Sequence, residues 1–144
     1  MKILISYFYQ IRFFEPTMIP LSTCLSDPKY YSNGGKPYQD KRGVWNGFKA
    51  NIFIPNETCE GLCRGPQNCT NIGTKCKFLE AYKKQLSKLD FNHTMELLEK
   101  FGSRFDFEPT YVLIVYEKPD NPCSERWPLV EWFKENGVDL EEFK

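Results

Sequence analysis

The longest apolar runs in the chain lie near its two ends. Residues 2–9, KILISYFY, are almost entirely apolar, and residues 110–118, TYVLIVYEK, form a continuous β-branched and aromatic run. Runs of this kind are typical of strands that are covered on both faces in a parallel sheet. A shorter run at residues 18–25 predicts another strand. Pro20 inside it indicates an edge position or a bent start, because proline cannot donate to a strand ladder.

Helical periodicity begins near Cys76, where apolar residues start to recur on one face with lysines on the rest. A second helix is expected to follow, capped by Asn92. A third is expected over residues 124–137, ended by Gly137, and residues 138–143 predict one more turn. The residues expected to face inward in the first two helices are Phe78, Leu79, Tyr82, Leu86 and Leu89, then Met95, Leu98, Phe101 and Phe105.

The segment between the second strand and the first helix lacks a clear period. Residues 26–58 are rich in glycine, proline and aromatic side chains, with one short strand expected at 51–55, and a cysteine-rich loop follows. Strands that alternate with helices favour an α/β domain. We therefore expect residues 1–144 to form a single small three-layer domain, Rossmann-like or flavodoxin-like. Its sheet is expected to be mainly parallel, and residues 26–76 are expected to be an irregular insertion.

Charge and hydropathy narrow the class of protein. The chain holds 19 Lys and Arg against 19 Asp and Glu, so it shows no strong electrostatic signal for nucleic acid. No apolar run approaches the length of a transmembrane helix, and the N-terminus resembles a signal peptide only briefly. These features predict a cytoplasmic protein without a membrane partner, in which thiols stay reduced. The three N-x-T sequons are then chance matches.

Four of the six cysteines fall in one loop with C-x3-C-x5-C-x6-C spacing. Four thiolates make a closed tetrahedral site for zinc, and the glycines between them allow the tight backbone that such a site needs. The spacing lacks the paired C-x2-C hooks of common zinc knuckles. A structural zinc is the leading interpretation, with an iron–sulfur cluster, disulfides or separate thiols as alternatives. The expected metal ligands are Cys59, Cys63, Cys69 and Cys76.

The segment after the last apolar strand predicts a ligand site. In open α/β sheets, ligands bind beyond the carboxyl ends of the strands. The loop there is stiffened by two prolines and leads into a helix whose first turn carries Arg126, a bidentate partner for phosphate or carboxylate. The alternative is a surface ion pair between Glu117 and Arg126 with Ser124 as a helix cap. The residues expected to bind ligand are Glu117, Lys118, Cys123, Ser124 and Arg126.

The same segment, YVLIVYEKPDNPCSERWPLVEWF, resembles the C-terminal signature of the family called domain of unknown function 488. In that signature an apolar strand and a Glu-Lys-Pro turn precede Cys-His-Arg at the start of a helix. Residues 5–31 and the helix YKKQLSKLDF resemble phage and bacterial members. The histidine of the motif is absent, because Ser124 and Glu125 stand between Cys123 and Arg126. The resemblance implies a Rossmann-like architecture and a site at this corner.

Three functions are weighed from these features. The first is a module that binds a nucleotide-like or other anionic small molecule, with tyrosines and tryptophans of residues 30–48 stacked on its ring. A sequestering or inhibitory factor of phage type would fit it. The second is an enzyme acting on a glycosidic or phosphoryl bond through Cys123 or Glu117. The third is a zinc-stabilised module that binds a protein partner or forms a homodimer. The lone His93 is expected to be a solvated first-turn residue.

Overall fold

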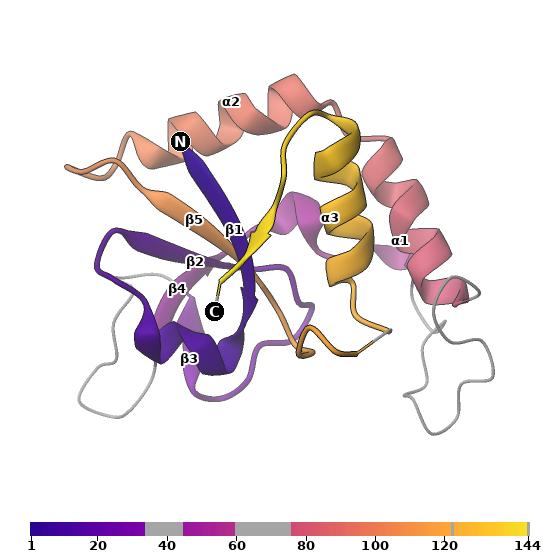
Figure 1. Ribbon diagram of the computed structural model, residues 1–144, viewed down its shortest axis with the longest axis horizontal. Helices are drawn as coiled ribbons and strands as arrows, with labels where there is room; N and C mark the ends of the chain where they lie inside the picture. The colour runs from indigo at the N-terminus through magenta and orange to yellow at the C-terminus, as the bar shows by residue number, and fades with distance from the viewer. Residues whose placement is uncertain (34–44, 60–75, 122, 144) are drawn as a thin grey trace.

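The chain folds around one all-parallel sheet, which confirms the predicted α/β class. The computed structural model describes residues 1–33, 45–59, 76–121 and 123–143 (Figure 1). Within them the strand order is β3-β4-β2-β5-β1-β6, and every pairing is parallel. The strands are β1 (Lys2–Tyr7), β2 (Met18–Ser22), β3 (Tyr31–Asn33), β4 (Trp45–Lys49), β5 (Thr110–Val115) and β6 (Glu141–Glu142).

The helices cover the two faces of the sheet unequally. One face carries the three α-helices, and the other carries the short 3-10 helix η1 (Figure 1). This arrangement is Rossmann-like, with one thick and one thin outer layer. The helices are α1 (Lys77–Ser87), α2 (Phe91–Gly102), α3 (Arg126–Glu135), η1 (Phe8–Phe13), η2 (Asn51–Phe53) and η3 (Glu57–Cys59).

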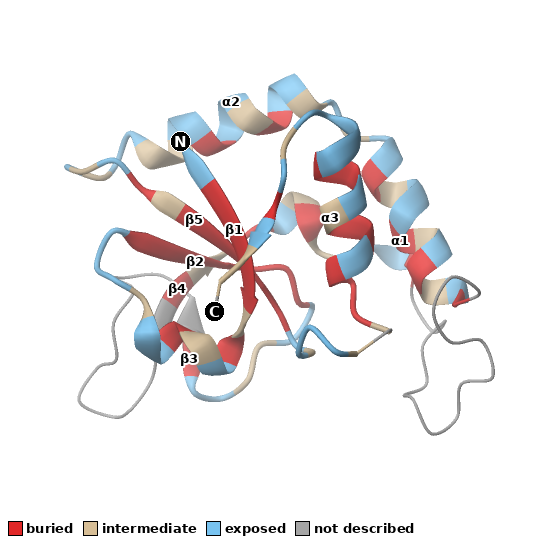
Figure 2. Cartoon of the chain, in the orientation of Figure 1, coloured by how far each residue is buried: buried red, intermediate tan, exposed pale blue. Residues whose placement is uncertain are grey.

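Strand β5 is the centre of the sheet. It pairs with β1 from Lys2↔Thr110 onward and with β2 from Met18↔Thr110 onward. Residues 111–115 are all buried, and in Figure 2 this strand is red along most of its length. The predicted covering of both faces is therefore confirmed. Alternate side chains of such a strand point to opposite faces, so β5 contributes to both halves of the core.

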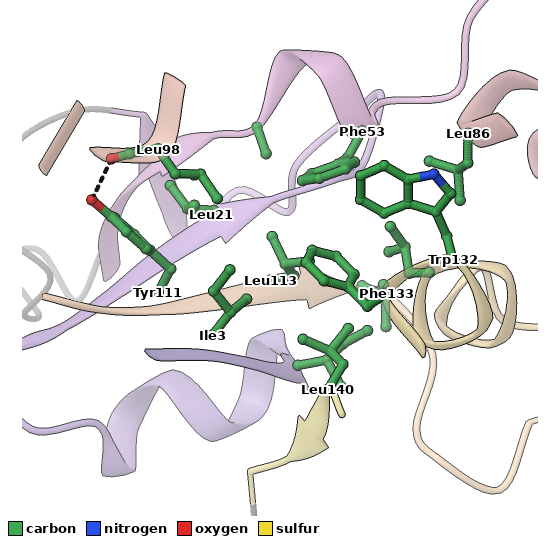
Figure 3. Close-up of a cluster of buried hydrophobic side chains, with 14 of the residues drawn as sticks. Ile3, Leu21, Phe53, Leu86, Leu98, Tyr111, Leu113, Trp132, Phe133 and Leu140 are labelled. Atoms are coloured by element: carbon green, nitrogen blue, oxygen red, sulfur yellow. Dashed lines mark hydrogen bonds between the residues drawn. The ribbon is translucent and has the colours of Figure 1, made fainter. Parts of the chain in front are cut away.

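The larger half of the core lies under the α-helices. Figure 3 shows Leu113 from β5 packed among Phe53, Trp132 and Phe133, with Leu98 of α2 at the far end of the cluster. The Tyr111 hydroxyl donates to the Leu98 carbonyl over 2.7 Å, so a buried polar atom is satisfied. The smaller half lies under η1 and includes Leu4, Phe8, Ile11, Val112 and Ile114.

Pro20 lies inside the sheet, so the predicted edge position is wrong. Strand β2 pairs with β5 on one side and with β4 on the other. The β4 ladder begins only at Leu21↔Phe48, one residue after Pro20. Beside Pro20, where the β2–β4 ladder has not yet begun, the Tyr31 hydroxyl lies between the two strands. It is 3.3 Å from the Pro20 carbonyl and donates to the Phe48 carbonyl over 2.6 Å. The proline therefore falls where no backbone donor is needed.

Several other local predictions are wrong. Residues 26–58 contain strands β3 and β4, and residues 51–53 form a 3-10 helix where a strand was predicted. Residues 8–9 belong to η1, and residues 141–142 form β6 beside β1 where a turn was predicted. Asp90, not Asn92, caps α2, since its side chain accepts from the His93 backbone N–H. The three predicted α-helices and Gly137 as the residue that ends α3, with a φ of 84°, are confirmed.

Candidate functional site

The connections that follow β1 and β5 leave the carboxyl edge of the sheet toward opposite faces. These strands are neighbours. After β1 the chain enters η1 on the thin face, whereas after β5 it leads to α3 on the thick face. Such a topological switch point opens a crevice between the two connections and is where open α/β sheets bind ligands. The topology therefore supports a site at this edge.

An aromatic pocket lies at this switch point. Its volume is about 600 Å³, which is within the usual range for small-molecule sites. The Phe8 ring meets Tyr30 and Tyr116 edge to face, with ring centroids 6.3 and 5.2 Å apart. Tyr30 and Tyr116 are 43% and 50% exposed, so both rings offer surface to a ligand. The lining residues are Tyr7, Phe8, Tyr9, Tyr30, Tyr116 and Lys118.

Lys118 is the one predicted ligand residue that lines this pocket among those the structure describes there. It is exposed and follows the end of β5 by three residues. Its neighbour Glu117 is half-buried, and Glu117 Oε2 is buried without a hydrogen-bond partner among the described residues. Burial raises the pKa of Glu117. The strand end therefore supplies one accessible cation and one carboxyl group whose pKa lies above its ordinary value.

Arg126 has its guanidinium bound within the chain. It is 1% exposed. Its Nε donates to Glu142 Oε1 over 2.6 Å, and its Nη2 donates to Glu142 Oε2 over 3.2 Å. Its Nη1 donates to the Glu117 carbonyl over 2.7 Å and to Ser124 Oγ over 3.2 Å. The predicted bidentate fork thus exists, and a carboxylate from β6 occupies it.

The two other predicted ligand residues lie in the turn before α3. Cys123 is half-buried, and its backbone N–H donates to Asn121 Oδ1 over 2.8 Å. Ser124 is fully buried, and its hydroxyl oxygen accepts from the Arg126 backbone N–H over 3.1 Å. Ser124 therefore helps to start the helix and to hold Arg126. Neither residue is among those that line the aromatic pocket.

A buried polar cluster that the sequence analysis missed lies at the end of β2. Thr23 Oγ1 lies 2.8 Å from Glu125 Oε1 and 3.0 Å from the Ile114 carbonyl. Cys24 Sγ lies 3.8 Å from the same carboxylate oxygen. Burial raises the pKa of Glu125 to about 8, and the nearby Glu117 carboxylate adds to the effect. Burial also raises the pKa of the Cys24 thiol, so this cysteine is a poor source of thiolate.

The predicted zinc ligands fall only partly within the described residues. Cys59 and Cys76 are both buried, at 3% exposure each, at the end of η3 and just before α1. Cys63 and Cys69 lie outside the described residues. Over the ranges that the structure describes, no three metal-ligating side chains gather. Zinc therefore stays a prediction. His93 is exposed in the first turn of α2, as expected.

The comparisons with known proteins leave the family open. No family model, no curated protein and no solved structure gives a significant match to this chain. The resemblance to domain of unknown function 488 stays a prediction. None of the helices in the described part of the chain is long and apolar enough to cross a membrane.

Proposed function

We propose that the protein binds a small anionic molecule with a planar ring, such as a nucleotide-like compound, at the switch point between β1 and β5. The ring lies against the tyrosines of the pocket, and Lys118 faces the anionic group. The observation that carries this proposal is the place of the aromatic pocket, at the carboxyl edge of β1 and β5 where the topology opens a crevice. A phage-type sequestering factor remains one biological setting for such binding.

The chemistry of the pocket supports this class of ligand. Among the described residues, every side chain that lines it is aromatic except Lys118. Aromatic rings accept planar ligands by stacking, and each stacked base is worth about 1–3 kcal/mol in nucleic-acid complexes. A lysine at the rim adds a single positive charge without fixed geometry. The pocket therefore selects for a flat ring and a negative charge more than for one hydrogen-bond pattern.

Calorimetry with mononucleotides and nucleotide sugars tests the proposal. Tyr116→Ala removes a half-exposed ring and should weaken binding by about 5- to 100-fold, the equivalent of one lost stacking contact. Lys118→Ala should weaken it by about tenfold and make binding less sensitive to salt. Lys134→Ala, an exposed lysine in the last turn of α3, is the matched control. Equal binding by all four proteins would place the ligand elsewhere.

A second candidate function is general-acid cleavage by Glu117, which lies between the pocket residues Tyr116 and Lys118 in the chain. Its support is Glu117, whose pKa is raised by burial and whose Oε2 has no hydrogen-bond partner among the described residues. In this reaction Glu117 donates its proton to the leaving group as the glycosidic or phosphoryl bond breaks, the hydroxide of a water molecule adds to the other fragment, and the remaining proton of that water returns to Glu117. Release of free base or phosphate by wild type, and its loss in Glu117→Gln, would favour the enzyme. Cys123 gains no such support.

A further inference from the structure

The edge of Arg126 that suits a planar anion is the edge that Glu142 occupies. Nε and Nη2 point to the two oxygens of one carboxylate, at 2.6 and 3.2 Å. This parallel pair of bonds is the geometry by which arginine binds carboxylate and phosphate ligands. The remaining bonds, to Glu117 and Ser124, use only Nη1. If Glu142 left, the guanidinium would keep its position and present a vacant fork.

Arg126 is also joined directly to the wall of the aromatic pocket. Its Nη1 donates to the carbonyl of Glu117, which lies between the two pocket residues Tyr116 and Lys118. Solvent does not reach the guanidinium, which is 1% exposed, whereas the Glu142 side chain is 18% exposed. The open side of the ion pair is therefore the side of Glu142.

The segment that carries Glu142 is lightly held. Strand β6 has two residues and, among the strands that the structure describes, pairs only with β1, through Leu4↔Glu141 and Ile5↔Glu142. Beyond it, the Phe143 N–H donates to the Ile5 carbonyl over 2.8 Å, and the Phe143 ring packs on Phe14 with centroids 4.9 Å apart. In Figure 1 this segment lies along the outer edge of β1 and ends near η1. A short edge strand of this kind has few backbone pairings, so the ion pair with Arg126 is a main contact that keeps it docked.

We propose that Glu142 is an internal competitor for the anionic group of the ligand, and that β6 must leave Arg126 before that group can bind there. The inference rests on the proposed function, since it concerns how the same site is opened. A ligand anion of phosphate or carboxylate class replaces the Glu142 carboxylate on Nε and Nη2. The apparent affinity of the protein is then the affinity of the open form multiplied by the fraction of molecules in which β6 is undocked.

We call the docking of Glu142 and β6 on Arg126 the latch. Pyrophosphate is the probe for this latch, because it carries the anionic group without a ring. Glu142→Gln keeps the shape of the side chain but removes its charge, and it should bind pyrophosphate at least about tenfold more tightly than wild type. Glu141→Gln is the matched control, since Glu141 is the exposed neighbour in the same strand. It should bind as wild type does. Binding is measured by calorimetry on proteins that unfold cooperatively. A folded Glu142→Gln protein with wild-type affinity would overturn the proposal.

Two further measurements keep the latch testable if Glu142→Gln does not fold. Phe143→Ala removes the contact with Phe14 but leaves the ion pair, so it should loosen β6 and raise pyrophosphate affinity. In wild-type protein, saturating pyrophosphate should speed hydrogen exchange at the Phe143 amide, whose acceptor is Ile5. Unchanged affinity in Phe143→Ala together with unchanged exchange in wild type would also overturn it.

The latch and the ring pocket can fail separately. Nucleotide binding that depends on Tyr116 but is unaffected by Glu142→Gln would retain the pocket and reject the latch. Tighter pyrophosphate binding in Glu142→Gln, with no ring-bearing ligand sensitive to Tyr116→Ala, would retain the latch and reject the ring pocket.

Discussion

The Thr23 hydroxyl oxygen lies within hydrogen-bond distance of two acceptors, the Ile114 carbonyl and a carboxylate oxygen of Glu125. The Thr23 hydroxyl oxygen lies 3.0 Å from the Ile114 carbonyl and 2.8 Å from Glu125 Oε1, and all of these groups are buried. A threonine hydroxyl has only one hydrogen to donate. If it donates to Ile114, the second hydrogen has to come from a protonated Glu125. Burial raises the pKa of Glu125 to about 8, so the carboxyl group is mostly neutral at pH 7 and can supply that hydrogen.

Stability should consequently depend on pH through Glu125. Its pKa rises from an ordinary 4.5 to about 8 on folding, so the folded state holds the proton more tightly. The resulting stabilisation is fully present below pH 4.5 and is lost as the pH rises through 8. Glu125→Gln stays neutral at every pH. The free energy of unfolding of wild type, relative to Glu125→Gln, should fall by an amount on the order of a few kcal/mol across this window. Urea melts from pH 4 to 9 would measure it, and parallel curves would contradict the assignment.

Leu113→Ala should be strongly destabilising, because β5 is the centre of the sheet. Leu113 is 0% exposed and lies in the core below the α-helices. Large-to-small changes at such sites cost about 2–5 kcal/mol, since a cavity is left behind. Leu97→Ala is the matched control, because Leu97 is 40% exposed on α2 and should cost less than about 0.5 kcal/mol. Denaturant unfolding compares the two, and equal losses would argue against the central place of β5.

Gly47→Ala should destabilise the outer part of the sheet. A Cβ atom at this position would lie 2.2 Å from the Tyr31 hydroxyl and 2.7 Å from the ring carbon that bears it. The ring cannot move easily, because Tyr31 is buried and its hydroxyl donates to Phe48. Overpacking of this kind costs about 1–3 kcal/mol.

The double variant Tyr31→Phe with Gly47→Ala tests the cause of that loss. It removes the nearest clashing atom, so it should lose less stability than the sum of the two single changes. Thermal melts of the four proteins measure the coupling. Additive losses would mean that Tyr31 and residue 47 do not meet.

The zinc prediction is tested by metal content. If Cys59, Cys63, Cys69 and Cys76 bind zinc, the purified protein should carry about one equivalent, and denaturation should release it with four reactive thiols. Cys59→Ser or Cys76→Ser should lose most of the metal and lower the thermal midpoint, whereas Cys24→Ser should keep the metal. Elemental analysis measures this directly. A brown protein would favour an iron–sulfur cluster, and a metal-free, colourless one would leave disulfides or separate thiols.

The parts of the fold that were predicted correctly have strong local signals. The run TYVLIV marks β5 by itself, and the three α-helices follow from periodic apolar faces. Strands β3 and β6 have no such signal, because they are three and two residues long. Strand β3 is held by pairing to β4, the next strand in the chain, and β6 by pairing to the distant strand β1. An edge position was predicted for Pro20 because proline has no backbone donor. The Tyr31 hydroxyl that lies beside its carbonyl comes from another segment, so the sequence around Pro20 does not reveal it.

The site was predicted only in outline for a similar reason. The carboxyl end of β5 and Lys118 follow from the strand pattern and the rule for open sheets. The aromatic pocket combines residues from around β1, from the segment before β3 and from the end of β5. Likewise, the partner of Arg126 is a glutamate sixteen residues further on, brought beside it by β6. Spacing along the chain carries no information about either juxtaposition.

The position of β5 between β1 and β2 also sets an order of events during synthesis. Lys2 and Met18 both take Thr110 as their register partner. Strands β1 and β2, which are synthesised first, therefore cannot pair with β5 until most of the chain has been made. Contacts so distant in sequence close slowly. A nascent chain that has not reached residue 110 therefore exposes two apolar strands with open edges, the feature that chaperones recognise and that drives aggregation of incomplete chains.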